Sequence, residues 1–340
     1  MKFCFLIVSL IIFLGELIVK YVSQDDEWTK LLNDHNEIYS NRPLIKEMLD
    51  QILAKHSFLT PNLFHVCIKS KFQLQNQPRS DKINFFFEVE HTLVTDGGKT
   101  IPPGTSKGNI ATYDKTNAYL VRIECVECYK SADIVVDYSS LNMENIRTSG
   151  VFNDDFVHKS TYAPAIPFPY DPYHKNHSQV LLNTAYSRSG GRRSLITNQI
   201  FKVLGRQSLS NMYFETLPWF MEDLDNVKIL VNVHATDFDH TLEEFRILPA
   251  LLRGVVVVSE WVPLHHLLPY KDYIIFETFD KLVEKVVEVV NNYDSYRDKF
   301  FGPRSKLNET IHRMKETALH ELERRVLERY HQLNISQPQG

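Results

Sequence analysis

The sequence lacks an excess of basic residues, and this absence argues against one large class of partners. Its 340 residues include 38 lysines and arginines and 42 aspartates and glutamates, which gives a formal net charge of -4. Proteins that bind a phosphate backbone usually carry a basic surface that attracts it. We therefore expect no nucleic acid among the partners of this protein.

Cysteine is also scarce, with four residues in the chain. Cys125 and Cys128 form a CxxC pair, a spacing found in redox dithiols and in one half of a zinc site. A zinc site of this kind needs a second pair of ligands at short spacing, and none follows. Two other interpretations stay open, namely that the two cysteines are incidental to the edge of a strand or helix, or that one of them is bonded to Cys67.

Internal repeats and low-complexity tracts are absent as well, which excludes a repeat architecture. Hydrophobic residues make up 43% of the chain and aromatic residues 12%, so the protein can bury a large core. Its length predicts either two domains or one large domain.

The longest apolar run lies at the amino terminus. Residues 3–19, FCFLIVSLIIFLGELIV, are almost wholly apolar and follow Lys2. The run is just long enough to cross a bilayer, although Glu16 weakens that interpretation. A cleaved signal peptide is the alternative, but no pair of small residues follows at the expected spacing. We expect residues 1–20 to be an anchor.

This segment predicts a destination in the endomembrane system, in the Golgi or the ER. An uncleaved anchor would give a single-pass membrane protein with a lumenal domain, and cleavage would give a secreted protein. The chain also contains three sequons that permit glycosylation in that compartment, at Asn176, Asn308 and Asn334.

Strand and helix patterns alternate along most of the chain. A helical stem or outer layer is expected at 21–70, and the segments 71–175 and 176–304 each contain short apolar runs followed by polar residues and amphipathic stretches. Such alternation is typical of parallel sheets covered by helices. We predict an α/β fold in which two Rossmann-like domains face a cleft, after an amino-terminal hydrophobic helix. A charged helix and tail are expected at 305–340.

The segment 241–260, TLEEFRILPALLRGVVVVSE, makes the most specific predictions. Thr241 and Glu244 have the spacing of a capping box, which predicts that a helix begins there and presents free N–H groups suited to a diphosphate. Pro249 removes one helical hydrogen bond and predicts a kink or a restart at Leu248. Gly254 would then allow a tight turn into a buried strand of four valines.

The stretch VKILVNVHATDFDHTLEEFRILPALLRGVVVVSE resembles the nucleotide-sugar-binding half of the GT-B glycosyltransferases. It is similar to the family 1-like group, whose members carry a helix, an Ala-Leu-x-x-Gly turn and a valine-rich strand in this order. ADIVVDYSSLNMENIRTSG and the GGRR of 190–193 resemble other parts of the same group, so the resemblance spans about 130–300.

This resemblance implies a metal-independent hexosyltransferase-like glycosyltransferase. The enzyme would move a sugar from a nucleotide-sugar donor to a glycan, protein or lipid acceptor. It would need no cofactor apart from the donor, which is a substrate. The amino-terminal helix would add the membrane to its partners.

The resemblance also places the donor at the carboxyl edge of the second sheet. In the family a basic residue in the first loop of the carboxyl-terminal domain contacts the diphosphate, and Arg192 or Arg193 occupies that place. The fork of an arginine side chain suits a diphosphate well. The predicted donor-binding residues are Gly191, Arg192, Arg193, His234, Asp237, Thr241, Glu243, Glu244, Ser259 and Glu260.

Each part of this site has a simpler explanation. The turn at 190–193 can be an exposed basic turn without a ligand, and the loop at 234–240 a solvated polar loop or, by residue type, a set of metal ligands. Glu244 can serve only to cap its helix.

Three of the candidate catalytic residues end the first strand of the amino-terminal domain, and the fourth lies in the loop after a strand of the second domain. A general base must stand within hydrogen-bond reach of the acceptor hydroxyl, and a carboxylate or imidazole at a strand end can do so. The alternative is an exposed polar strand exit, and Asp137 and Ser139 share this ambiguity. The predicted catalytic residues are Glu88, Glu90, His91 and His240.

One departure from the family pattern affects the functional hypothesis. The family often places a glutamate that holds the donor ribose five residues before the glycine of the turn, and here that residue is Pro249. Glu243, Glu244 or Glu260 can substitute, or donor binding is altered or lost. A non-catalytic relative that serves as a binding or scaffold protein is therefore the alternative hypothesis.

Overall fold

The computed structural model divides into two compact units, 1–64 and 65–340. None of the described helices combines the length and the apolarity that a membrane span requires. The apolar run predicted as an anchor lies outside the described residues. The structure describes residues 42–69, 74–75, 78–88, 92–95, 107–114, 117–123, 125–149, 152, 154–166, 169–173, 179–182, 191–205, 209–211, 224–234 and 240–336.

The first unit contains two described helices. Helix α2 (Arg42–Lys55) lies in the predicted helical stem, and the short 3-10 helix η1 (Pro61–Leu63) follows it. The apolar residues of α2 recur at the spacing of one helical face, which explains why a helix forms there. Its most deeply buried side chains are Met48, Leu49, Ile52 and Leu53.

The first sheet has five strands in the order β2-β1-β3-β7-β8. Strands β3, β7 and β8 are parallel, and their register aligns Glu88 with Asp137 and Asp137 with Tyr162. The strands are β1 (Phe64–Lys69), β2 (Leu74–Gln75), β3 (Ile83–Glu88), β7 (Ile134–Asp137) and β8 (Ser160–Tyr162). The helices between them are α3 (Val126–Ser131), α4 (Ser140–Ser149) and α5 (Asp154–Lys159).

A small antiparallel sheet lies between β3 and α3 in the sequence, and the strand pattern did not predict it. Its order is β4-β6-β5, and both pairings are antiparallel. The strands are β4 (Leu93–Thr95), β5 (Lys107–Asp114) and β6 (Asn117–Arg122).

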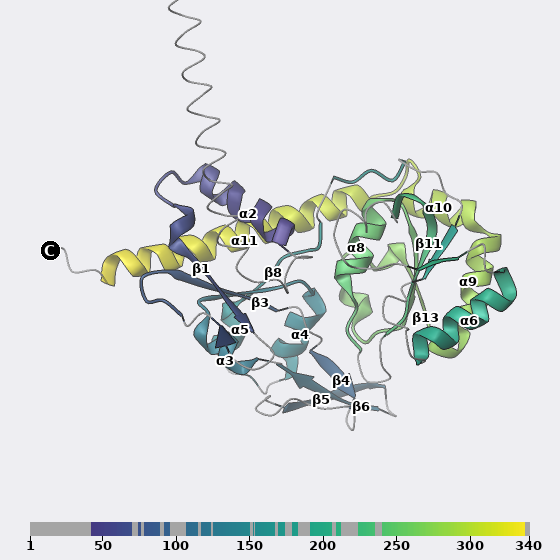
Figure 1. The fold of residues 1–340 in the computed structure, drawn as a ribbon, viewed down its shortest axis with the longest axis horizontal. Helices are drawn as coiled ribbons and strands as arrows, with labels where there is room; N and C mark the ends of the chain where they lie inside the picture. The colour runs from purple at the N-terminus through teal and green to yellow at the C-terminus, as the bar shows by residue number, and fades with distance from the viewer. Residues whose placement is uncertain are drawn as a thin grey trace, which may run out of the picture. The chain divides into compact units, whose positions relative to one another are not determined.

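The second sheet is wholly parallel, with the order β10-β9-β11-β12-β13. In Figure 1, helix α8 covers one face and helices α6 and α9 cover the other. The strands are β9 (Gln179–Leu182), β10 (Leu209–Asn211), β11 (Val227–Asn232), β12 (Val256–Glu260) and β13 (Ile274–Glu277). The helices are α6 (Arg192–Leu204), α8 (Glu244–Leu252), α9 (Leu282–Asn291), α10 (Tyr293–Phe301) and α11 (Leu307–Ser336).

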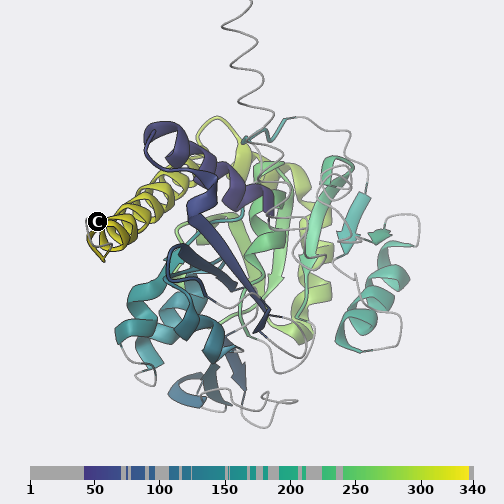
Figure 2. The same ribbon diagram turned by 60° about the vertical axis from the view of Figure 1, so that its left-hand side comes forward.

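The described architecture is therefore α/β with parallel sheets, as the alternating pattern predicted. The division of 71–304 into two domains stays a prediction. Helix α11 contacts β3 and β8, so it runs along the first sheet although it follows the second in sequence (Figure 1 and Figure 2).

The valine run forms the centre of the second sheet. Strand β12 lies between β11 and β13, and Val255 to Val258 are completely buried. A continuous apolar run is the pattern of a strand covered on both faces. The turn before it requires Gly254, because its φ is +64° and an added Cβ would lie 2.6 Å from the carbonyl oxygen of Pro172.

The predicted restart at Leu248 does not occur, since α8 continues through Pro249 to Leu252, and the kink stays a prediction. Pro249 and Leu252 are buried, and so are Ile247 and Leu251. The loss of one backbone hydrogen bond does not end the helix, because tertiary packing of its apolar face supplies most of a helix's stability.

Cys125 and Cys128 are bonded to each other. Cys125 stands at the N-cap of α3, and Cys128 is completely buried in a core cluster that also contains Phe86 and Tyr129. The interpretation that one of the pair is bonded to Cys67 is therefore wrong. The interpretation that the pair is half of a zinc site is wrong as well. Within the described part of the chain, no group of three metal-ligating side chains comes together.

Candidate functional site

The candidate site forms where β11 and β12 end beside the start of α6. The register of the second sheet places Asn232, the last residue of β11, next to Ser259, and Glu260 ends β12. Gly191 precedes α6 with a φ of +108°, a conformation that glycine adopts without strain. Carboxyl ends of parallel strands and helix amino termini are the usual place for ligands in an α/β fold. Arg192 begins the helix at this edge.

Arg192 forms a bidentate ion pair with Glu260. Its two terminal nitrogens lie 3.1 and 2.6 Å from the two carboxylate oxygens, and both side chains are largely buried. Glu260 also accepts a hydrogen bond from the backbone N–H of His234, at 3.1 Å. The guanidinium group lies 4.0 Å from the centre of the Phe279 ring, in a cation–π contact. These contacts fix the charge of Arg192 at one position.

Glu243 is the centre of the cluster, and its side chain is 7% exposed. One carboxylate oxygen lies 3.3 Å from Arg246, 3.6 Å from Arg193 and 3.8 Å from Nδ1 of His234. The other oxygen accepts a hydrogen bond of 2.8 Å from the side-chain amide of Asn232. Arg193 also donates from Nε to the carbonyl of Val233, at 2.9 Å. We call Arg192, Arg193, Asn232, His234, Glu243, Arg246, Ser259 and Glu260 the charged cluster.

The charged cluster carries more positive than negative charge. Three guanidinium groups, those of Arg192, Arg193 and Arg246, face the carboxylates of Glu243 and Glu260. Burial lowers the pKa of His234, but the neighbouring Glu243 and Glu260 carboxylates raise it by more, so the net shift is upward. His234 therefore stays protonated to a higher pH than an ordinary histidine. This arrangement suits an anionic ligand.

Glu244 points to a different place from its neighbour Glu243. Its carboxylate is completely buried and accepts hydrogen bonds from the backbone N–H and the hydroxyl of Ser140, at 2.9 and 3.1 Å. The hydroxyl of Tyr162 donates a further bond of 2.5 Å. Ser140 begins α4 and Tyr162 ends β8, so Glu244 joins the second sheet's helix to the first sheet's edge.

The predicted capping box of Thr241 and Glu244 is wrong. Helix α8 begins at Glu244, with Glu243 at the N-cap and no capping bond from its side chain. Instead, the Glu244 carboxylate satisfies the free N–H at the start of α4, a different helix. Burial raises the pKa of Glu244 from its usual 4.5 to about 7, against the lowering effect of hydrogen bonds from Tyr162, Tyr270 and Ser140.

The edge of the first sheet holds a second pair of acids. Asp137 is completely buried, and one of its oxygens accepts hydrogen bonds from the Ser139 backbone, at 2.8 Å, and from the Asn142 amide, at 3.1 Å. Burial and the neighbouring Glu88 raise the pKa of Asp137 well above its usual range. Glu88 is 3% exposed, so the interpretation of it as an exposed strand exit is wrong.

The structure thus brings together most of the predicted donor-binding residues. Among the predicted residues outside the charged cluster, the ring of His240 lies 5.9 Å from that of His234, and Thr241 is buried. Glu88 lies at the edge of the first sheet. Glu244 lies where α8 contacts Ser140 and Tyr162. Glu90, His91 and Asp237 lie outside the described residues.

Sequence reasoning missed four residues of these sites. Asn232 ends an otherwise apolar strand, and Arg246 stands three residues after Glu243, where side chains meet on a helix. Both features were visible signals. No local pattern marked Ser140 or Tyr162, because their partner is 104 and 82 residues away in sequence.

No family model matches the chain. An uncharacterised protein of Acanthamoeba polyphaga mimivirus is 35% identical to it over 78 residues, which are 22% of this chain and 28% of that protein. TarM is similar with a TM-score of 0.36 and 9% identity, over 74% of this chain and 50% of TarM. The wall teichoic acid polymerase TagF has a TM-score of 0.34 and 9% identity, over 91% of this chain and 96% of that one. Similarity at these TM-scores does not establish a shared fold.

Proposed function

We propose that the protein is a glycosyltransferase that moves a sugar from a nucleotide-sugar donor to a glycan, protein or lipid acceptor. The sequence resemblance to the family 1-like GT-B enzymes motivates the proposal. The observation that carries it is the charged cluster, in which three largely buried guanidinium groups lie around two carboxylates at the carboxyl edge of a parallel sheet.

The chemistry of sugar transfer from such a donor requires a stabilised diphosphate leaving group. Arg192 and Arg193 begin α6, so their charge would add to the free N–H groups and positive dipole of a helix amino terminus. Groups that are already held in place cost no reorganisation when charge develops on the leaving group. In this proposal Glu243 and Glu260 hold the cations in position, and the cations neutralise the diphosphate.

In this proposal Arg192 binds the diphosphate while it stays paired with Glu260, which accepts two of its hydrogen bonds. A phosphate oxygen would extend the pair instead of replacing it. His234 would contribute a further positive charge.

The acceptor hydroxyl would be activated by a general base within hydrogen-bond reach of it. Glu88, Glu90, His91 and His240 stay the candidates for this base. His240 is half-buried beside His234, which places an imidazole next to the charged cluster. The proposal includes no metal ion and no cofactor besides the donor.

The apolar segment at 1–20 supports a separate proposal about location. We propose that this segment delivers the protein to the endomembrane system, in the Golgi or the ER, and anchors it there with a lumenal catalytic portion. A cleaved segment would instead release a secreted enzyme.

Thermal unfolding with a panel of nucleoside diphosphates tests donor binding. A specific ligand raises the melting temperature because it binds the folded state. The variant Arg192→Gln with Glu260→Gln removes both charges of one pair and should abolish the shift. Arg253→Gln with Asp225→Asn is a matched control, because it removes a part-buried pair of 3.1 Å outside the charged cluster. Absence of any shift at millimolar ligand would contradict the proposal.

A specific observation also favours the second candidate, a non-catalytic binding or scaffold protein. Arg192 and Arg193 both have partners within the protein, as purely structural arginines would. The two candidates differ in turnover. An enzyme releases nucleoside diphosphate from a nucleotide sugar in the presence of an acceptor extract, whereas a binding module shows the thermal shift without release.

A further inference from the structure

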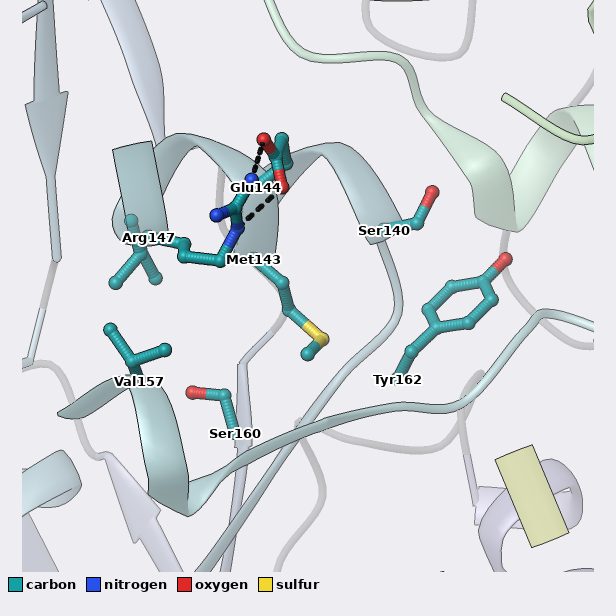
Figure 3. Close-up of a pocket in the computed structure, with 8 residues that line it drawn as sticks. Ser140, Met143, Glu144, Arg147, Val157, Ser160 and Tyr162 are labelled. Atoms are coloured by element: carbon teal, nitrogen blue, oxygen red, sulfur yellow. Dashed lines mark hydrogen bonds and ion pairs between the residues drawn. The ribbon is translucent and has the colours of Figure 1, made fainter. Parts of the chain in front are cut away.

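A second hollow lies away from the charged cluster, between α4, β8, the turn at 267–269 and α11. It is a cavity of about 820 Å³, and a smaller pocket of about 210 Å³ adjoins it over α4 and β8. Figure 3 shows the smaller pocket, with Met143 pointing into it between Ser160 and Tyr162. A volume of a few hundred to about a thousand Å³ is typical of small-molecule sites.

The lining of the large cavity is mainly apolar. Met143 of α4 faces it, and so do Met314 and Ala318 of α11. Leu267 and Pro269 close one side, and Leu267 is 48% exposed. Methionine side chains adapt their shape to an apolar ligand. The body of a fitting ligand is therefore hydrophobic.

The cavity is elongated along α11. Its lining residues on this helix run from Thr310 to Arg325. At a rise of about 1.5 Å per residue, this stretch of helix is roughly 22 Å long. Tyr162 is the one aromatic residue among the described residues of the lining, so the cavity offers little for a nucleobase to stack on. A chain fits this shape better than a ring system.

Cationic side chains give the cavity its polar character. Arg147 pairs with Glu144 at one end, as Figure 3 shows, and Arg325 pairs with Glu321. Arg313 also lines the cavity, and among the described residues no ion pair joins it to a carboxylate. The lining therefore holds one more guanidinium group than carboxylates, and an anionic group would be attracted to Arg313.

We propose that this cavity binds an amphipathic anion, a molecule with one hydrocarbon chain and a phosphate or carboxylate headgroup. The chain would lie along α11 against Met143 and Met314, and the headgroup would pair with Arg313. This proposal does not rest on the proposed function, because none of the residues of the charged cluster lines the cavity.

Calorimetric titration with three probes below their micelle concentrations tests the proposal. Octyl phosphate has both the chain and the anionic headgroup, octyl glucoside has the same chain with a neutral headgroup, and inorganic phosphate has the charge without a chain. We expect octyl phosphate to bind at least about tenfold more tightly than octyl glucoside or inorganic phosphate. Only octyl phosphate combines the burial of an apolar chain with a charge-assisted hydrogen bond. Equal binding of octyl glucoside or of inorganic phosphate, or no binding of octyl phosphate, would overturn it.

Two variants locate the bound probe. Thr317→Trp fills the cavity from an exposed position of α11, and Arg313→Glu reverses the charge at the headgroup. Thr317→Trp should abolish octyl phosphate binding, and Arg313→Glu should weaken it about tenfold or more. His320→Trp and Arg304→Glu are matched controls at exposed positions outside the lining. Unchanged binding by Thr317→Trp, or equal loss in the controls, would place the probe elsewhere and overturn the proposal.

Discussion

Buried carboxylates at the edge of the first sheet lie beside other acids, whereas those at the edge of the second lie beside guanidinium groups. Asp137 aligns with Glu88 in the register of β3 and β7, and both side chains are buried. In the second sheet, Glu243 and Glu260 each contact arginine. The first arrangement raises the pKa of Asp137, whereas the second pairs its carboxylates with guanidinium groups.

Glu243 and Glu244 are neighbours in the sequence, yet of the two only Glu243 lies beside guanidinium groups of the described residues. Glu243 has arginines around it, and Glu244 is surrounded by the hydroxyls of Ser140 and Tyr162. Hydroxyl groups stabilise a carboxylate less than a guanidinium group does, so burial raises the pKa of Glu244 to about 7. The surroundings of Glu244, and not its residue type, therefore determine its pKa.

The largest effect is expected when the centre of the charged cluster loses its charge. Glu243→Gln leaves Arg193 and Arg246 buried beside a neutral group, and removal of one partner of a buried ion pair costs about 3–5 kcal/mol. Urea unfolding measures the loss. Glu309→Gln, at an exposed position of α11, is the matched control and should change stability very little. A loss as small as that of the control would mean that Glu243 does not balance these cations.

The pH dependence of stability should depend on Glu244. Its pKa is about 7 in the folded state against a usual 4.5, so the folded protein holds a proton that the unfolded chain has released. Its contribution is complete below the unfolded value and is lost as the pH rises towards 7. The difference corresponds to roughly 3 kcal/mol at most.

Glu244→Gln cannot ionise, so this variant should lose less stability than the wild type between pH 4.5 and 7. Urea unfolding of both proteins at several pH values gives the difference directly. Parallel pH profiles of the two proteins would show that the pKa of Glu244 is the same in the folded and unfolded states, which would contradict its assigned environment.

A smaller effect is expected from Tyr162→Phe. This change removes one hydrogen bond to Glu244 and leaves the ring in place, which costs about 1–3 kcal/mol for a buried bond to an acidic group. The variant should also raise the pKa of Glu244 further, because the Tyr162 bond lowers it. Chemical denaturation at pH 5 and pH 8 separates the two effects. A loss that is larger at pH 5 than at pH 8 would contradict the assignment.

The smallest effect concerns ligand affinity at the charged cluster. The pKa of His234 is raised, so the imidazole is protonated below that value and attracts an anion. Affinity for a nucleoside diphosphate should fall as the pH rises through this pKa, by less than about tenfold for one charge. The terminal phosphate of the ligand also ionises at about pH 6, so the effect of His234 is the difference between the wild type and His234→Gln, measured by calorimetry at pH 6 and pH 8. The same change in affinity with pH in both proteins would contradict this role of His234.

Local patterns predicted much of the fold. The apolar runs of β3, β7, β11 and β12 were recognisable as buried parallel strands, because each is short, rich in apolar residues and followed by polar residues. The antiparallel strands β4 to β6 had no such run and were missed. The continuation of α8 through Pro249 was also missed, because it depends on tertiary packing.

The site was predictable in its position and less so in its contacts. The edge of the second sheet follows from the rule on strand ends, and Arg192, Arg193, Glu243 and Glu260 do meet there. Spacing alone could not show that Glu244 turns away from this edge. Thr241 and Glu244 have capping-box spacing, but the partner that orients Glu244 is remote in sequence.

The central claim is that the charged cluster binds the diphosphate of a nucleotide. Calorimetric titration of the wild-type protein with a panel of nucleoside diphosphates, each compared with its own nucleoside, tests it most directly. The account predicts that one of the diphosphates binds at least about tenfold more tightly than its nucleoside, because charge-assisted hydrogen bonds to arginine form only with the diphosphate. Equal affinity of each nucleoside and its diphosphate, or no binding of either, would contradict it.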